Sequence, residues 1–217
     1  SLWFWWWECI TSLKIVQMKV LASCNISRSG VYVNNTLNFS IPKDSEDWKK
    51  EIYRYLEVDY PKFHKMDALA KMAFLGAELL GRTCDLTAWG EDDLALIFAN
   101  SHSSYDTDLR FIESYTEKGS PSPSLFVYTL PNILTGELAI RHKWYGENIF
   151  FILEKFDAGF YIDQINFYFR KGAKACLCGW VESVNGREVC ALFLAIPGEG
   201  EVTESELVNI LKHNINE

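Results

Sequence analysis

The chain contains no cysteine pair at the spacing of a redox or zinc motif. Its cysteines include no CxxC and have no histidine nearby at zinc-ligand spacing. Cys176 and Cys178 lie two apart in a strand-like run, so their side chains share one face. We expect reduced, mostly buried thiols, no metal and no cofactor. The six cysteines stand at positions 9, 24, 84, 176, 178 and 190.

Positive charge is also scarce. Lys and Arg number 21 against 29 Asp and Glu, which gives a formal net charge of −8. Binding to nucleic-acid phosphates draws on clustered Lys and Arg, and the sequence has no such cluster. These counts argue against a general nucleic-acid binder, whereas acidity by itself identifies no partner.

The first residues lack the features of an export signal and of a membrane span. Residues 1–17 hold an aromatic cluster without a basic start, and their apolar run breaks at Glu8, far short of the roughly 20 residues that cross a bilayer. They are compatible with an additional strand, an interfacial anchor, or translated sequence upstream of a natural start at Met18. We favour the last, a non-native leader, because a recognisable strand follows Met18. Residues 18–217 contain no linker-like stretch and are expected to form one cytoplasmic domain.

Strand-like and helix-like patterns alternate along this domain. Strands are predicted at 19–27, 93–101, 149–153, 173–183 and 187–197. Helices are predicted at 46–56, 64–81, 106–119, 158–172 and 203–213. The alternation indicates an α/β layered fold.

Several residues are predicted to begin or end these helices. Glycines are expected to stop three of them, at positions 81, 119 and 172. Asp106 or Thr107 could cap the helix that follows them, and Thr203 with Glu206 forms a capping-box pattern. Asn185-Gly186 predicts a hairpin turn between the last two strands.

The segment 122–154 is central to the functional reading. It joins a loop, a helix-patterned stretch, a tight Tyr-Gly-Glu-Asn turn and a short apolar run that should be a buried strand. Ligands of α/β sheets bind outside the carboxyl ends of the strands, so an enzyme would place its nucleophile directly after this run. The residues found there, 154–159, are Glu-Lys-Phe-Asp-Ala-Gly and include neither Cys nor Ser.

Three segments resemble the β-ketoacyl-acyl-carrier-protein synthase family. An early family helix is similar to FHKMDALAKMAFLGAELL, and a later family strand with its preceding basic-Gly turn is similar to RKGAKACLCGWVES. Between them, SPSLFVYTLPNILTGELAIRHKWYGEN resembles the family stretch in which Ser-Pro leads to an Asn, a helix with a Gly, and a turn. The matched motif positions are Ser122, Pro123, Asn132, Gly136 and Gly146.

The resemblance implies a thiolase-like fold, in which two βαβαβαββ halves pack together. This chain has room for the first half, with a mixed central sheet covered by helices. The family's nucleophilic Cys would follow the strand 149–153, and counting forward from Asn148 puts that position at Lys155, whereas counting back from Gly159 puts it at Phe156. Neither side chain can form a thioester, and the family's catalytic histidines belong to the second half. The resemblance therefore implies a vacant nucleophile position and no catalytic residue.

Ketosynthase-like subunits without the Cys, called chain length factors, pair with active ketosynthases in bacteria. The sequence resembles the short members found in aryl-polyene and flexirubin-type pigment clusters. This implies a heterodimer with a full-length ketosynthase, or a homodimer, that meets acyl carrier protein through the complex. The strand before the nucleophile would pair across the two-fold axis. The residues expected at the dimer interface or acyl tunnel are Asn148, Phe150, Phe151, Ile152, Leu153, Phe156 and Phe160.

Two alternatives remain open. One is a 3-oxoacyl synthase or acyltransferase that is active by itself with a different nucleophile, and the other is a structural homodimer. Lys155 could serve as an amine nucleophile, although an ion pair with Glu154 or Asp157 is the expected state.

The histidines offer no clear catalytic base. His64, His142 and His213 have no nucleophile that the sequence can name as a partner, so we expect surface or locally hydrogen-bonded roles. Ser101 and His102 follow a strand and could suggest a Ser/His pair. Adjacent loop residues rarely face each other, so we do not expect that pair to form.

Overall fold

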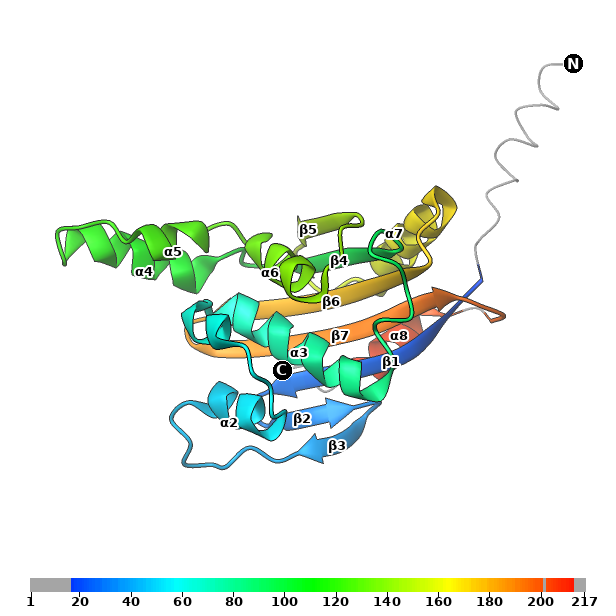
Figure 1. Ribbon diagram of the computed structural model, residues 1–217, viewed down its shortest axis with the longest axis horizontal. Coiled ribbons are helices and arrows are strands. Elements are labelled where there is room, and N and C mark those ends of the chain that lie inside the picture. Colours follow the sequence, from blue (N-terminus) through cyan, green and yellow to red (C-terminus); the bar gives the residue numbers. More distant parts are fainter. Residues whose placement is uncertain (1–16, 201, 213–217) are drawn as a thin grey trace, which may run out of the picture.

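Seven strands pair in one mixed sheet with the order β3-β2-β1-β7-β6-β4-β5 (Figure 1). The computed structural model describes residues 17–200 and 202–212, so the expected leader lies almost wholly outside the described residues. Strand β4 is parallel to β5 and β6, whereas β7 is antiparallel to β6 and β1. The strands are β1 Met18–Ser27, β2 Gly30–Val33, β3 Thr36–Phe39, β4 Leu94–Asn100, β5 Asn148–Ile152, β6 Ala175–Val184 and β7 Arg187–Pro197.

Helices cover both faces of this sheet. One buried cluster joins a sheet face to α2, α3 and α6, and a second joins the opposite face to α7 and α8 (Figure 1). The helices are α2 Trp48–Tyr55, the 3-10 helix η1 Pro61–Lys65, α3 Ala68–Thr83, α4 Tyr105–Thr116, α5 Pro123–Val127, α6 Ile133–His142, α7 Ala158–Lys171 and α8 Glu204–Ile210.

The element order agrees with the predicted fold class. With the β2–β3 hairpin set aside, the chain runs β1, α3, β4, the α4–α6 helices, β5, α7, β6 and β7, which is βαβαβαββ. The predicted α/β half with a mixed central sheet is therefore confirmed.

Strand β4 is formed by a continuous apolar run, because both of its faces are covered. Every one of its residues is buried, and alternate side chains enter the two different clusters. Leu94, Leu96 and Phe98 pack toward α3, whereas Ala95, Ile97 and Ala99 pack toward α7.

Some predicted helix ends are wrong. Gly81 lies inside α3, which continues to Thr83, and α4 ends at Thr116 rather than at Gly119. Asp106 lies within α4 instead of capping it. Its carboxylate accepts hydrogen bonds from Ser183 Oγ and from the backbone N–H groups of the 185–186 turn, at 2.7 to 3.2 Å. The tertiary contact with the hairpin outweighs the local capping preference.

Other ends are confirmed. The Thr203–Glu206 capping box forms at the start of α8. Gly172 ends α7 in a left-handed conformation, with φ 106°, and Asn185 with Gly186 makes the β6–β7 turn with positive φ at both residues. Strand β3 was not expected from the sequence, although Asn34 and Asn35, both at positive φ, make the turn that leads into it.

Strand β5 is the last strand of the described sheet and pairs only with β4. Asn148 and Ile152 at its ends are exposed, and the three residues between them are half-buried. The prediction of a buried strand is therefore wrong for this chain, because no described strand covers its outer edge.

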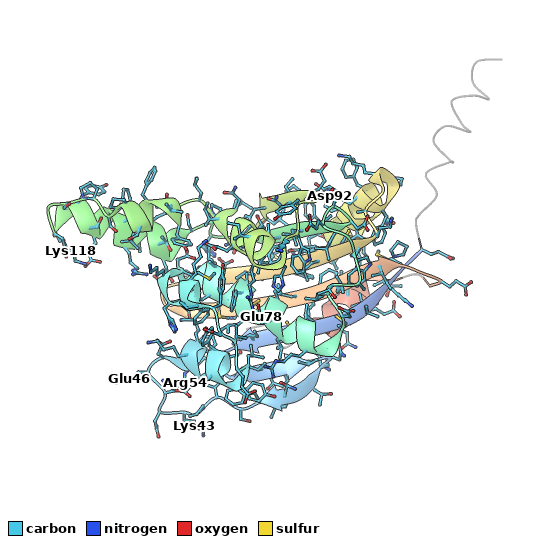
Figure 2. All side chains as sticks on the ribbon, viewed as in Figure 1. Lys43, Glu46, Arg54, Glu78, Asp92 and Lys118 are labelled. Carbon is cyan, nitrogen blue, oxygen red and sulfur yellow. The ribbon has the colours of Figure 1, made fainter. Side chains whose placement is uncertain are left out.

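The turn before β5 is fixed by close backbone approach. The N–H groups of Tyr145 and Gly146 donate to Glu91 O, at 2.7 and 3.2 Å. A Cβ at Gly146 would lie 2.5 Å from Leu94 O. The preceding helix α6 is tied to α3 by a 2.8 Å bond from Arg141 Nε to Glu78 Oε1 (Glu78 is labelled in Figure 2).

We predict that Gly146→Ala destabilises the chain by ~1–3 kcal/mol, because the added methyl group meets backbone atoms that cannot move aside. Gly136→Ala is the matched control, since Gly136 is helical and a Cβ there meets nothing within 4 Å. It should be neutral or stabilising by up to ~1 kcal/mol. Urea unfolding midpoints of both variants measure the difference, and equal midpoints would contradict the account of the turn.

Candidate functional site

The carboxyl ends of the parallel strands β4, β5 and β6 border a pocket of about 510 Å³. This is the edge at which α/β sheets bind ligands. Its polar and charged lining includes Ser101, His102, Glu154, Lys155, Glu182 and Arg187. Its apolar lining includes Phe156, Trp180, Val184 and Val189.

The loop after β4 is held in one shape by Asn100. The Asn100 side chain is fully buried; its Nδ2 donates to Ser103 O at 2.8 Å, and its Oδ1 accepts from Ser103 N at 2.9 Å. Ser103 has a positive φ of 55°, a conformation that costs a non-glycine residue roughly 1 kcal/mol or more. The amide clamp fixes the positions of the two residues in between, Ser101 and His102.

Those two residues meet a carboxylate from β6. Ser101 Oγ lies 2.6 Å from Glu182 Oε2 and 2.8 Å from His102 Nδ1, and Ser101 N donates to the same carboxylate oxygen at 2.9 Å. His102 Nδ1 is 3.4 Å from Glu182 Oε2. The expectation that Ser101 and His102 would not face each other is wrong, because the clamped loop turns both side chains toward Glu182.

Glu182 was not singled out from the sequence. Strands β4 and β6 pair with Ala99 opposite Trp180, so Glu182 lies beyond the end of β4 and beside Ser101. Its side chain is 14% exposed, and its Oε1 has no hydrogen-bond partner among the described residues. Only the strand register brings it to the pocket, and a sequence pattern does not give that register.

The position expected for a nucleophile lies at the same pocket. Lys155 and Phe156 both line it, and no described cysteine does. Phe156 stacks on Tyr161, with ring centroids 5.2 Å apart, and meets the Trp180 ring edge-on at 6.0 Å. Asp157 caps α7 by accepting from Phe160 N at 3.0 Å. The start of α7 therefore carries a carboxylate.

Lys155 differs from its expected ion-paired state. Among the described residues it forms no ion pair with Glu154 or Asp157, and Asp157 instead binds the α7 backbone. Lys155 lines the pocket together with the charged residues Glu154, Glu182 and Arg187.

The thiols lie elsewhere and are poor nucleophiles. Cys24, Cys176, Cys178 and Cys190 are buried, and Cys84 is half-buried at the end of α3. Burial raises the pKa of Cys24 and of Cys176 to about 12, and raises the pKa of the other two buried thiols as well. Cys9 lies outside the described residues.

The residues expected at an interface or tunnel divide between the two faces of the sheet. Phe150 packs against the cluster under α3 and α6, whereas Phe151, Leu153, Phe156 and Phe160 pack against the cluster under α7. The rings of Phe151 and Phe160 meet edge-to-face at 4.8 Å. On β5, Asn148 Oδ1 accepts from Thr135 Oγ1 at 3.2 Å. The Ile152 side chain, at the end of β5, is 53% exposed.

Four of the motif positions lie at the starts of α5 and α6 and within α6. Ser122 Oγ accepts from Leu125 N at the start of α5, and Pro123 is the first residue of that helix. Asn132 precedes α6 without a side-chain cap bond. Gly136 leaves open space on α6.

The other described histidines lie away from the pocket. His64 is exposed beside the rings of Tyr53 and Phe63. His142 stacks on Trp144 near Glu78, and burial lowers its pKa. His213 lies outside the described residues.

Two kinds of feature are absent from residues 17–200 and 202–212. No group of three or more His, Cys, Asp or Glu side chains there is arranged to hold a metal ion. None of the described helices is long and apolar enough to cross a membrane.

Comparison with known proteins identifies the fold. No protein-family model matches the sequence, and no curated protein matches it. A solved chain from the complex of a ketosynthase with its chain length factor from Xenorhabdus doucetiae has a TM-score of 0.58 and 13% identity, covering 85% of this chain and 80% of that one. The ishigamide ketosynthase/chain length factor gives 0.58 and 16%, covering 85% and 63%.

A third structure is a type II polyketide acyl-carrier protein in complex with its ketosynthase, with a TM-score of 0.59, 11% identity and coverage of 83% and 62%. The chain thus has the thiolase-like fold of ketosynthase and chain-length-factor structures. It spans 63% of the length of the matched chain in the second structure and 62% in the third, less than two thirds of each.

We predict that the thiols react slowly with iodoacetamide at pH 8, because thiolate is the reactive form and burial disfavours it. A Cys9→Ser variant removes the one cysteine that lies outside the described residues. The same variant unfolded in urea gives the labelling rate of the other five cysteines when they are exposed. Mass spectrometry of the peptides should find Cys84 labelled first in the native protein. Rapid labelling of a cysteine from β6 or β7 would contradict this description of the site.

Proposed function

We propose that this chain is a chain-length-factor-type partner of an active ketosynthase, non-catalytic in condensation, in bacterial fatty-acid, polyketide or pigment biosynthesis in the cytoplasm. The observation that supports this most is the uncovered outer edge of β5. Backbone N–H and C=O groups on an apolar edge invite pairing with another strand, so a covering subunit is physically expected.

Further exposed apolar side chains lie in the segment of the chain that leads to this edge. Ten of the fifteen large apolar side chains exposed in the described chain lie between Tyr105 and Ile152, and we call them the 105–152 surface. Seven of the ten lie on helices α4 and α5 or just after α5. These two helices project beyond the sheet in Figure 1, and Lys118 is labelled near their tip in Figure 2. Exposed apolar side chains that gather on one part of a surface are typical of protein interfaces.

The members of the 105–152 surface come from three helices, the turn and the strand edge. They are Tyr105, Leu109, Ile112, Tyr115, Phe126, Val127, Leu130, Ile140, Tyr145 and Ile152. Gly136, with open space around it on α6, leaves room nearby for close approach of a second backbone.

The partner we favour is a full-length ketosynthase. Lys155 and Phe156 stand where the family thiol would be, so this chain needs a subunit that carries the acyl group. Two of the similar structures are described as a ketosynthase with a chain length factor, and another contains an acyl carrier protein. By the same reasoning, acyl carrier protein would be reached through the complex. Phe150, Phe151 and Phe160 would then lie near the chain-measuring tunnel.

The second candidate is an acyltransferase that acts by itself. The unpaired ammonium group of Lys155 and the Ser101 hydroxyl in the same pocket favour it, because either could in principle accept an acyl group. A homodimer through β5 is the third, and the same exposed edge supports it.

Ile152→Asp should dissolve the complex. The carboxylate would be buried without a partner at the proposed interface, which costs several kcal/mol. Ile152 is exposed in the single chain, so its fold should survive. Leu37→Asp is the matched control, because Leu37 is 52% exposed on the opposite edge strand β3.

Phe151→Asp tests the same strand with a half-buried residue. The readout is size-exclusion chromatography of the chain alone and co-expressed with the ketosynthase of the same genome, with a thermal melt of each variant. A complex that survives Ile152→Asp, or that Leu37→Asp breaks equally, would count against an interface at β5.

Acyl labelling separates the two leading functions. Purified chain incubated with radiolabelled acyl-acyl-carrier-protein should take up no covalent label, and label should appear on the co-purified ketosynthase alone. Lys155→Ala should leave the condensation rate of the complex nearly unchanged. Label on this chain, or a rate loss beyond about a hundredfold, the scale of a lost acid–base group, would favour the acyltransferase.

A further inference from the structure

The pocket contains a histidine whose arrangement the partner role does not use. His102 is 52% exposed, lines the pocket, and contacts Ser101 and Glu182 through Nδ1. No hydrogen bond of its Nε2 occurs among the described residues. Nδ1 is therefore fixed by Ser101 and Glu182, whereas Nε2 can contact a ligand.

The contacts determine where the protons lie. A carboxylate oxygen only accepts, so the Ser101 hydroxyl donates its single proton to Glu182 Oε2 across 2.6 Å. Ser101 Oγ can then only accept from His102 Nδ1–H across 2.8 Å. The neutral imidazole consequently carries its proton on Nδ1 and its lone pair on Nε2.

The same contacts stabilise the charged form of the ring. When Nε2 takes a proton, the imidazolium faces Glu182 Oε2 at 3.4 Å and is bridged to it by Ser101. The Asn100 clamp and the strained Ser103 hold the loop before any ligand arrives. A histidine with a fixed tautomer and a carboxylate behind it has the arrangement of a general base.

The rest of the pocket suits an acyl chain. Trp180, Phe156, Val184 and Val189 supply an apolar wall beside the polar cluster. The charged groups that line the pocket with His102 are Glu182 from β6, Glu154 and Lys155 from the segment after β5, and Arg187 from β7. The cations can hold a carbonyl oxygen as it becomes negative.

We propose that this pocket hydrolyses acyl thioesters, with His102 as the general base and Ser101 and Glu182 as positioning residues. His102 Nε2 takes a proton from water while the water oxygen bonds to the thioester carbonyl carbon. The C–S bond then breaks, and the imidazolium returns the proton to the leaving thiolate. A carboxylic acid and a thiol result, with no other reactant. The choice of a thioester over an oxygen ester rests on the proposed partner function, whereas the chemistry rests on the pocket.

The test is the hydrolysis of the butyryl thioester of N-acetylcysteamine by the purified chain, followed as butyric acid by chromatography. The rate should exceed the uncatalysed rate and rise with pH, because only the neutral imidazole can take the proton. His102→Ala should lower it by ~100-fold or more, the lower end for an acid–base group. Added imidazole should restore part of the loss, beyond the rate of imidazole without protein.

Three further variants make the assignment specific. Glu182→Gln keeps an acceptor for Ser101 but removes the charge that favours the imidazolium, so the midpoint of the pH profile should move to lower pH. Ser101→Ala should reduce the rate without abolishing it, because the hydroxyl only positions the ring. His64→Ala changes an exposed histidine on η1 and should have no effect.

No hydrolysis above the uncatalysed rate, or full activity in His102→Ala, overturns the proposal. An unmoved pH midpoint in folded Glu182→Gln overturns the positioning roles. The assay uses the chain without its partner, so a negative result leaves complex formation untouched, and failed complex formation leaves this assay valid.

Discussion

The parallel pairing of β4 with β5 on one side and β6 on the other positions both the pocket and the open strand edge. Because the three strands run the same way, their carboxyl ends meet and bring Ser101, Lys155 and Glu182 to one pocket. The same pairing makes β5 the last described strand, so its outer edge stays open. A pocket and an uncovered edge therefore arise from one arrangement of backbone hydrogen bonds.

The start of α7 carries a carboxylate and an aromatic ring, and no described cysteine. A nucleophilic thiol at a helix start is activated because the helix dipole stabilises thiolate. Here the Asp157 carboxylate already satisfies that helix end, and Phe156 packs between Tyr161 and Trp180 as part of the core. None of the described cysteines lines the pocket; four of them are buried and Cys84 is half-buried. The polar cluster at this edge of the sheet is formed by Ser101 and His102, which follow β4, and by Glu182.

The fold could be predicted from the sequence because its strands carry strong patterns. The apolar run of β4 and the Asn185-Gly186 turn are local signals, and tertiary contacts agree with them. Helix ends were less predictable, since Asp106 is recruited by a hairpin about 80 residues away in sequence, a contact that no local pattern records. The pocket was missed for the same reason. Glu182 reaches Ser101 only through the β4–β6 register, and the Asn100 clamp reverses the expectation that adjacent loop residues face apart.

The account depends on another subunit covering the outer edge of β5. Hydrogen–deuterium exchange of the peptide that spans 148–153, compared between the isolated chain and its complex with the co-produced ketosynthase, measures this directly. Strand pairing across the edge would satisfy backbone N–H groups that are open in the single chain, so exchange should slow strongly there and remain unchanged in β3 at the opposite edge. Unchanged exchange at 148–153 in a demonstrated complex, or protection confined to β3, would contradict it.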